Sequence, residues 1–343
     1  MNRENPKIVF FGAGVIGGSV AGWIAPHCEN LFVLDQGETA AALKRDGVTL
    51  YLGDKPDDRQ QVKVNVIDRI EQAADADIIV LGVKNYSLEP VARLTKEKTG
   101  GRAVIVSMAN GCVNQEVLPK YFSRVIYCVI SYNAWMDKPG VIGFQKKGPL
   151  ILGTPDNGLQ EEMRVVADIF NRGVETVVTP HIQDAVHCKI VINLTNSVTT
   201  LVGHRFREIS DPAAFQRILS GLLWEGVEIV KAAGRRECKL GGMPSWALLW
   251  LGAKLPRVIT RPLFERNVKK MVMSSMAQDV IQRGGRDNEL ESINGHIVAL
   301  ADQFGMKAPF NRTVLAMCRK EFAKSDFQPL DVKEVWSEIE KAM

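Results

Sequence analysis

The sequence lacks the cysteine and histidine patterns of a disulfide framework or a common metal site. Its six cysteines are scattered, and no two of them form a Cys-x-x-Cys pair. We therefore expect free thiols in a reducing compartment, the cytoplasm. The five histidines show no His-Glu-x-x-His or related ligand spacing, so we expect no structural or catalytic metal.

Long apolar runs and strong net charge are also missing. No run reaches the roughly 18 to 20 apolar residues of a membrane-spanning helix. The most apolar stretch, 244–256, is expected to be buried or to line a pocket. The polar start of the chain leads directly into an expected strand, which is not the pattern of a signal peptide. The formal net charge is only +4, so we expect neither nucleic acid nor a membrane as a partner.

The first half of the chain alternates short apolar, β-branched runs with amphipathic stretches. This alternation predicts a parallel sheet covered on both faces by helices. The expected strands are 7–14, 31–35, 77–84, 102–110 and 125–131, with helices over 87–97 and 114–122. A hairpin over 140–154, a helix over 159–173 and a closing strand over 174–180 are expected to follow.

Beyond Pro180 the strand-like runs stop and helical periodicity continues to the end of the chain. The expected helices are 184–202, 212–233, 265–283, 289–304 and 311–323. The predicted fold class is α/β, with an N-terminal Rossmann-type doubly wound parallel sheet and an all-helical C-terminal domain. We predict a dinucleotide-binding domain over 1–180 and a helical substrate and catalytic domain over 181–343. No Gly/Ser linker separates them, so we expect packed domains with a cleft between them.

A glycine-rich turn follows the first expected strand and opens a helix. Glycines permit a tight turn and let the backbone approach a pyrophosphate at the helix N-terminus. Asp35 lies 18 residues after Gly17, at the end of the next strand, where an acid can bind both ribose hydroxyls of NAD. The alternative is a glycine-rich turn of another doubly wound protein. The predicted cofactor-binding residues here are Gly12, Ala13, Gly14, Val15, Ile16, Gly17 and Asp35.

One lysine interrupts an apolar helix, in the stretch HCKIVINLTN (187–196). On a helix, Lys189 falls with Asn193, Asn196 and Thr200 in a stripe about 60° wide, with Ser197 at its edge. Unpaired polar groups are costly to bury, so the stripe predicts a polar cavity. A lysine there can donate a proton to a carbonyl oxygen as hydride reaches the carbon. Alternatively, Lys189 reaches water and pairs with Asp184 or Glu208.

Longer motifs resemble the ketopantoate reductase (2-dehydropantoate 2-reductase) family. They are KIVIN (189–193), SMANGCVNQEVL (107–118), SSMAQD (274–279) and ELESINGHIVALADQFGMKAPFN (289–311). The resemblance covers the chain from the first strand to the last helices. It implies a Rossmann domain, a helical domain, reduction of 2-oxo acids to 2-hydroxy acids and a place in pantothenate biosynthesis.

The resemblance also assigns roles to single residues. Lys189 matches the family's proton donor, and Glu289 matches the acid near the nicotinamide ribose and the catalytic lysine. Ser275 matches the serine that contacts the substrate carboxylate. Each also has a structural alternative, such as a turn cap or a surface hydroxyl. Substrate-binding roles are implied for Asn193, Asn196, Ser197 and Ser275, and cofactor contacts for Lys84, Asn110 and Ala134.

Two positions depart from the family pattern and bear on the substrate. The family has an asparagine eight residues after the lysine, where this chain has Ser197, with Asn196 one position earlier. The position three residues before the substrate serine is usually polar and is Val272 here. With fewer partners for a distal hydroxyl, the site is expected to favour apolar bulk. The apolar segment 241–264 is expected either to line a roomier pocket or to form a homodimer interface.

The sequence thus predicts an NAD(P)-dependent 2-oxo acid reductase with Lys189 as proton donor. The alternatives are an NAD-dependent 2-hydroxy acid dehydrogenase of the same fold with a bulky apolar or aromatic substrate, and a non-catalytic dinucleotide sensor. NAD is favoured over NADP, because Asp35 and Gln36 stand where NADPH users typically carry an arginine. A carboxylate there would repel the 2′-phosphate. Lys44 and Arg45 are expected to be carried away from the turn on a helix.

Overall fold

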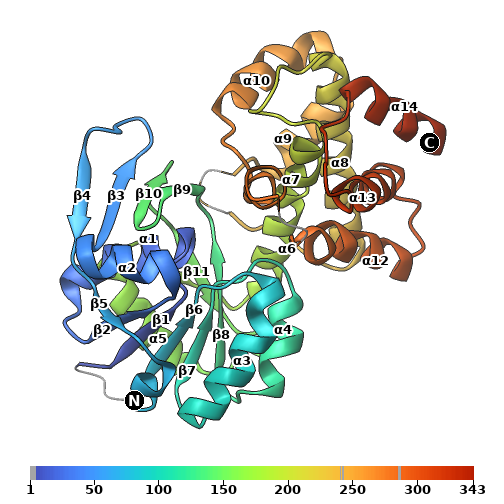
Figure 1. The fold of residues 1–343 in the computed structure, drawn as a ribbon. Coiled ribbons are helices and arrows are strands. Elements are labelled where there is room, and N and C mark those ends of the chain that lie inside the picture. The colour runs from blue at the N-terminus through green and yellow to red at the C-terminus, as the bar shows by residue number, and fades with distance from the viewer. Residues whose placement is uncertain (1–4, 240, 242, 285–286) are drawn as a thin grey trace. The chain divides into compact units, whose positions relative to one another are not determined.

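The computed structural model describes residues 5–239, 241, 243–284 and 287–343. The chain divides into two compact units, residues 1–183 and 184–343. The first unit is an α/β domain and the second is helical (Figure 1). The predicted fold class is confirmed.

An eight-stranded sheet forms the centre of the first unit, with the strand order β12-β11-β8-β7-β6-β1-β2-β5. All neighbours pair in parallel except β8 and β11. Six of the strands follow the Rossmann order. β6 has every residue fully buried, as expected for a sheet covered on both faces. The strands are β1 (Ile8–Phe11), β2 (Leu31–Leu34), β5 (Asn65–Ile67), β6 (Ile78–Leu81), β7 (Val104–Ser107), β8 (Val125–Ile130), β11 (Leu150–Gly153) and β12 (Thr176–Val178).

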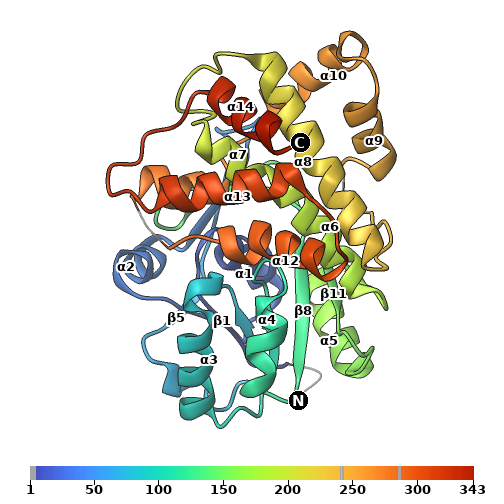
Figure 2. The same ribbon diagram turned by 90° about the vertical axis from the view of Figure 1, so that its right-hand side faces the viewer.

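The helices of this unit connect the strands and bury apolar faces against the sheet. Phe10 of β1 stacks on Phe170 of α5 with ring centroids 6.3 Å apart. α3 and α4 lie side by side (Figures 1 and 2). The helices are α1 (Val15–Ile24), α2 (Gly37–Asp46), α3 (Asn85–Thr99), α4 (Val113–Val117) and α5 (Gln160–Asn171), with 3₁₀ turns η1 (Ala25–His27), η2 (Ile70–Ala73) and η3 (Leu118–Lys120).

A second sheet has the order β4-β3-β10-β9 and packs against α1. Its strands are β3 (Val48–Leu52), β4 (Arg59–Val62), β9 (Ala134–Lys138) and β10 (Val141–Phe144). The expected hairpin over 140–154 is wrong, because β10 pairs with β3 and β9 while β11 pairs with β8 and β12. Two apolar runs separated by a turn predict local pairing, but each run here is buried in a different sheet.

In the described part of the second unit, every regular element is a helix. Its longest helix begins at Pro212 after Asp211, whose carboxylate accepts the N–H groups of Ala213 and Ala214. No helix in the described ranges is long and apolar enough to cross a membrane. The helices are α6 (Ile182–Asn193), α7 (Thr195–Leu201), α8 (Pro212–Ala232), α9 (Trp246–Lys254), α10 (Arg257–Lys270), α11 (Ser275–Ala277), α12 (His296–Gln303), α13 (Pro309–Phe322) and α14 (Val332–Ala342), with π-helical η4 (Gln278–Gln282) and η5 (Glu291–Gly295).

Two of the expected continuous helices are interrupted. The expected helix over 265–283 ends at Lys270, and α11 begins only after Ser274, whose hydroxyl caps it by accepting the Ala277 N–H. The expected helix over 184–202 breaks at Leu194, whose N–H is shared between the Ile190 and Val191 carbonyls. Helical periodicity continues through both breaks, so it did not reveal them.

Candidate active site

The glycine loop after β1 has the backbone geometry that a dinucleotide needs. Gly12 has a φ of +95°, which L side chains rarely adopt. A Cβ on Gly17 would lie 1.9 Å from the Gly12 carbonyl oxygen, so α1 can approach β1 only with glycine there. A Cβ on Gly14, the N-cap of α1, would meet nothing within 4 Å. The backbone at this helix N-terminus is therefore open to an approaching anion.

Gly82, directly after β6, belongs to the same backbone contact and was missed by sequence analysis. Its N–H donates to the Phe11 carbonyl. A Cβ on Gly82 would lie 2.6 Å from the Gly12 carbonyl oxygen and 3.0 Å from Gly17 Cα. A glycine at the end of an apolar strand was the available signal of a close backbone approach.

The Asp35 carboxylate braces the glycine loop. One of its oxygens accepts the Ala13 N–H at 2.6 Å, and the other accepts the Gln36 N–H at 2.7 Å. These bonds fix the carboxylate between the first and second strand ends. Each carboxylate oxygen retains a lone pair, so Asp35 can still accept hydrogen bonds from ribose hydroxyls.

The other predicted cofactor residues lie at three separate places in the first unit. Lys84 is the N-cap residue of α3, after β6, and Ala134 begins β9. The Asn110 carbonyl accepts a hydrogen bond from Asn85 Nδ2 at 2.7 Å, which joins the loops that follow β6 and β7. Lys84 and Asn110 therefore follow the carboxyl ends of neighbouring parallel strands, where Rossmann folds bind their ligands. The half-buried Val15 and Ile16 open α1.

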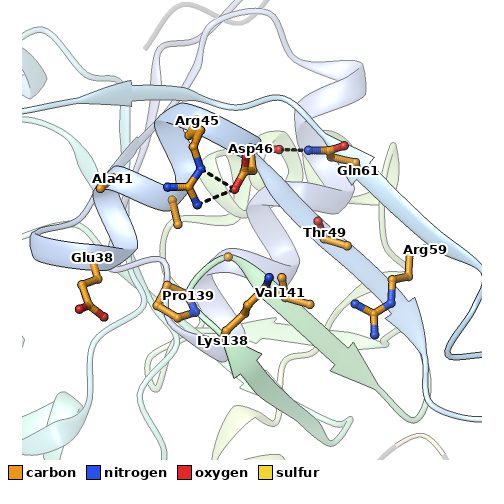
Figure 3. A pocket seen from close by; sticks show the side chains of 13 residues that line it. Glu38, Ala41, Arg45, Asp46, Thr49, Arg59, Gln61, Lys138, Pro139 and Val141 are labelled. Carbon is orange, nitrogen blue, oxygen red and sulfur yellow. Dashed lines mark hydrogen bonds and ion pairs between the residues drawn. The ribbon is translucent and has the colours of Figure 1, made fainter.

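The basic residues at the end of α2 are engaged in ion pairs. Lys44 pairs with Asp68, and the Arg45 guanidinium donates to Asp46 at 2.7 and 3.0 Å (Figure 3). Arg45 lines an open pocket of about 580 Å³ between α2 and the second sheet. The residues lining this pocket do not include Asp35 or the loop glycines, so it is distinct from the predicted cofactor site.

Lys189 is buried in α6, with 8% of its surface exposed. Within the described residues, no hydrogen bond or ion pair engages its ammonium. Desolvation lowers the pKa of Lys189 from 10.5 to about 8. The expected alternative pairing with Asp184 or Glu208 is not found among the described residues, and Asp184 accepts the backbone N–H of Arg236. The lysine is thus poised to give up its proton near neutral pH.

The polar stripe predicted around Lys189 is present only in part. Asn193, one turn after Lys189, is 9% exposed, and its amide has no protein hydrogen bond within the described ranges. Asn196 is half-buried, and its carbonyl accepts the Thr200 hydroxyl at 2.7 Å. Ser197 is fully buried: its hydroxyl donates to the Leu194 carbonyl at 2.7 Å and accepts from Asn294. These bonds favour a structural role for Ser197 over the expected substrate contact.

Ser275 and Glu289 lie on two further segments of the helical unit. Ser275 is half-buried at the first position of α11, which packs against α7. Ser274 strengthens this contact because its oxygen lies 3.3 Å from the Thr200 hydroxyl oxygen. Glu289 is 3% exposed and lies just before η5. Its carbonyl accepts the Ile293 N–H, which fixes the turn that carries it.

Comparisons with known proteins identify the family. The ketopantoate reductase PanE/ApbA model matches residues 8–157, and the model for the PanE/ApbA C terminal matches residues 181–321. The 2-dehydropantoate 2-reductase of Archaeoglobus fulgidus is 27% identical over 315 residues, covering 91% of this chain and 97% of that protein. The Pyrococcus abyssi enzyme of that name is 27% identical over 310 residues, covering 89% and 94%.

Solved structures show the same fold. A PanE/ApbA family ketopantoate reductase from Ralstonia eutropha JMP134 has a TM-score of 0.72 at 22% identity, covering 93% of this chain and 99% of that one. D-mandelate dehydrogenase in its ternary structure with NADH and anilino(oxo)acetate has a TM-score of 0.74 at 16% identity, covering 94% and 99%. At these identities the likeness concerns the fold alone.

The fold and the family models define a Rossmann-type oxidoreductase that uses a nicotinamide cofactor. The chain belongs to the ketopantoate reductase family. The predicted resemblance is therefore confirmed.

The open space at Gly14 gives a first prediction. Gly14→Ala should leave the melting temperature nearly unchanged, since the added methyl meets nothing within 4 Å and φ is −62°. The methyl would occupy the pyrophosphate space, so the Kd for the reduced cofactor, measured by its fluorescence, should rise at least about tenfold. Gly17→Ala is the control and should destabilise the fold itself. Unchanged cofactor affinity in folded Gly14→Ala would place the pyrophosphate elsewhere.

The buried charge of Lys189 gives a second prediction. The pKa of Lys189 is lower in the folded chain (about 8) than in the unfolded chain (10.5), so the unfolded chain holds this proton more tightly. The destabilisation is complete below pH 8 and disappears as the pH rises toward 10.5. Lys189→Met should therefore raise the free energy of unfolding at pH 7 by roughly 1 to 3 kcal/mol.

Urea unfolding of wild type and Lys189→Met at several pH values between 7 and 10 measures this difference. It should shrink steadily as the pH rises. Lys320→Met, at an exposed position on α13, is the matched control and should show no such trend. A gain from Lys189→Met that does not change with pH would indicate better packing rather than relief of a buried charge.

Proposed function

We propose that this protein reduces a 2-oxo acid to a 2-hydroxy acid with NADH, with Lys189 as the proton donor. The observation that carries the proposal is a buried lysine without a protein partner in the described residues, one helical turn from a nearly buried asparagine. Its pKa of about 8 allows the ammonium form to exist at neutral pH and to release a proton readily. A dinucleotide sensor has no need for such a group.

The reaction requires one hydride, one proton and a bound carboxylate. A bound reduced nicotinamide supplies the hydride to the carbonyl carbon. The Lys189 ammonium polarises the carbonyl oxygen and transfers a proton to it, so the product carries a hydroxyl and Lys189 is left as a neutral amine. Asn193 can donate an amide N–H to the same oxygen, because it lies one turn from Lys189 on α6. Water restores the proton of Lys189 after product release.

The remaining residues of the proposed site bind and orient. The Ser275 hydroxyl and the Asn196 amide are proposed to contact the substrate, with Ser275 at its carboxylate. Glu289 is proposed to act beside Lys189 and the nicotinamide ribose. The family resemblance supports these assignments, together with the packing of α11 against α7.

Two substrate classes remain, and each is supported by a different observation. Relatives named 2-dehydropantoate 2-reductase support ketopantoate as substrate and a place in pantothenate biosynthesis. A bulkier apolar or aromatic 2-oxo acid is favoured by Val272 and by Ser197, whose only proton is donated to Leu194. The D-mandelate dehydrogenase structure shows only that this fold occurs with an aromatic substrate class. We propose that ketopantoate is no better a substrate than a branched or aromatic 2-oxo acid of similar size.

We propose that the dinucleotide-binding domain comprises residues 1–180 and the substrate domain residues 181–343. The Asp35 carboxylate, the open space at Gly14, and Lys84 and Asn110 at neighbouring strand ends support the first assignment. The unpaired Lys189 supports the second.

We also propose that the enzyme forms a homodimer through α9 and α10. Several large apolar side chains of these helices are exposed, including Val258 at 88% and Ile259 at 64%. Exposed apolar patches of this kind mark interaction surfaces. A ketopantoate reductase from Staphylococcus aureus with the same fold is described as dimeric, which supports a second copy as the partner.

The proposed reaction leads to a third prediction. Oxidation of NADH should be observed with a panel of 2-oxo acids, and Lys189→Met should lower kcat by roughly 10²- to 10⁴-fold with little change in the Kd for NADH. Wild-type reduction should fall as the pH rises through about 8, because the ammonium is the proton donor. Full turnover in Lys189→Met would remove Lys189 from the mechanism. Inactivity of the wild type across the panel would refute the proposed reaction.

The cofactor choice leads to a fourth prediction. The ratio of kcat/KM for NADH to that for NADPH should exceed one, because Asp35 would face the 2′-phosphate and Lys44 and Arg45 are engaged in ion pairs. Replacing Asp35→Ser and Gln36→Arg together should move the ratio toward NADPH. Lys44→Ala is the control and should change it little. A wild type that prefers NADPH would show that Asp35 does not face the ribose.

A further inference from the structure

A fully buried hydrogen bond joins the π-helical turn η5 to α7. Asn294 Nδ2 donates to Ser197 Oγ at 2.9 Å, and both side chains are 0% exposed. Ser197 Oγ donates its only proton to the Leu194 carbonyl at 2.7 Å. The hydroxyl must therefore accept from Asn294, which fixes the orientation of the amide. The bond lies at the break between α6 and α7.

A second contact joins α6, which precedes α7, to α12, which follows η5. His187 Nε2 and His296 Nε2 lie 3.3 Å apart. Along α6 and α7, His187 and Ser197 stand before and after Lys189, so the two contacts bracket it. The segment that includes Asn294 and His296 is thus tied to the lysine-bearing segment at two points.

Both segments are irregular where Asn294 meets Ser197. α6 gives way to α7 at Leu194, and η5 is π-helical from Glu291 to Gly295. Irregular turns of this kind occur where side chains enter the helical hydrogen-bond pattern, and π-helical turns are frequent at functional sites. Glu289 lies five residues before Asn294, so a shift of η5 would move the acid relative to Lys189.

We propose that Asn294 is a positioning residue that holds the Glu289-bearing turn against the break between α6 and α7 and so fixes the surroundings of Lys189. The catalytic meaning of this role rests on the proposed function, but the geometry can be tested without any substrate. Truncation of Asn294 would leave the Ser197 hydroxyl without its donor and open a polar gap beside the break. Water entering this gap would solvate the Lys189 ammonium better and raise its pKa.

The test is a titration of the Lys189 amine by NMR in protein labelled with ¹³C at the lysine ε-carbon, with the signal assigned by its loss in Lys189→Met. In wild type the midpoint should lie near 8. In Asn294→Ala it should move toward 10.5 by at least roughly half a unit. Ser197→Ala should produce a similar shift. The other ionisable groups of these segments are Asp184, His187, Cys188, Glu289, Glu291 and His296. Imidazole signals are recorded in the same samples to follow the two histidines.

The variant that combines Asn294→Ala with Ser197→Ala distinguishes the loss of one specific hydrogen bond from a general destabilisation of the helical unit. If both residues act through one bond, Asn294→Ala with Ser197→Ala should shift the midpoint no further than the larger single shift. Additive shifts, or a midpoint unchanged in both single variants, would overturn the proposal. If Asn294→Ala does not fold, the midpoint in Ser197→Ala alone tests the proposal, because this variant removes the acceptor of the same hydrogen bond.

Asn311 provides the matched control. It is also an asparagine with 0% exposure in the helical unit, and its amide ties α13 to α8 through the Leu222 carbonyl and the Glu225 carboxylate. Asn311→Ala should lower the melting temperature and leave the Lys189 midpoint unchanged. An equal midpoint shift in Asn311→Ala would overturn the assignment of a specific role to Asn294.

Kinetics add a second readout that depends on the proposed function. Asn294→Ala should lower kcat about tenfold, since the variant disturbs the surroundings of the proposed proton donor. A wild type inactive toward every 2-oxo acid would refute the proposed function and leave the NMR result standing. An active wild type with no midpoint shift in the Ser197 and Asn294 variants would refute the positioning role alone.

Discussion

Burying the positive charge of Lys189 in an apolar helix costs folding free energy, and this cost sets the pKa of the lysine. Lys189 is surrounded on α6 by fully buried side chains such as Val191 and Ile190, and no described carboxylate pairs with it. A carboxylate partner would stabilise the charge and raise the pKa of the lysine, which would make it a poorer acid at neutral pH. The desolvated Lys189 therefore makes the folded state less stable at neutral pH, and its pKa lies closer to neutral than that of an exposed lysine.

In the first unit, the constraint is a close approach of three backbone segments that only glycines permit. Gly12, Gly17 and Gly82 lie so close together that a Cβ on either Gly17 or Gly82 would collide with the Gly12 carbonyl. This contact brings the N-terminus of α1 to the carboxyl edge of the sheet and leaves the space at Gly14 open. In the first unit a Cβ on Gly14 would meet nothing within 4 Å. In the second unit the Lys189 ammonium has no protein partner among the described residues.

Sequence patterns were sufficient for the features that depend on local chemistry. The glycine spacing and the apolar strands predicted the fold class, and the apolar residues around Lys189 predicted the helix that buries it. They failed for features that depend on contacts between residues far apart in the sequence. The runs at β10 and β11 read as a hairpin but joined different sheets. The hydrogen bond between Asn294 and Ser197 joins residues 97 positions apart. Periodicity contains no information about such a bond.

Asp35 and Ser197 both stand at expected ligand positions, but they differ in the number of hydrogen bonds they can still form. Asp35 accepts one N–H on each carboxylate oxygen, from Ala13 and Gln36, and a carboxylate offers about four acceptor sites in all. Two sites remain, which suits the two hydroxyls of a ribose. Ser197 has a single proton, which the Leu194 carbonyl takes, and Asn294 occupies one of its lone pairs. A buried hydroxyl in this state has no hydrogen bond left to donate to a substrate. Asp35 can therefore hold its loop and still accept hydrogen bonds from a ligand, whereas Ser197 has no proton left to donate to one.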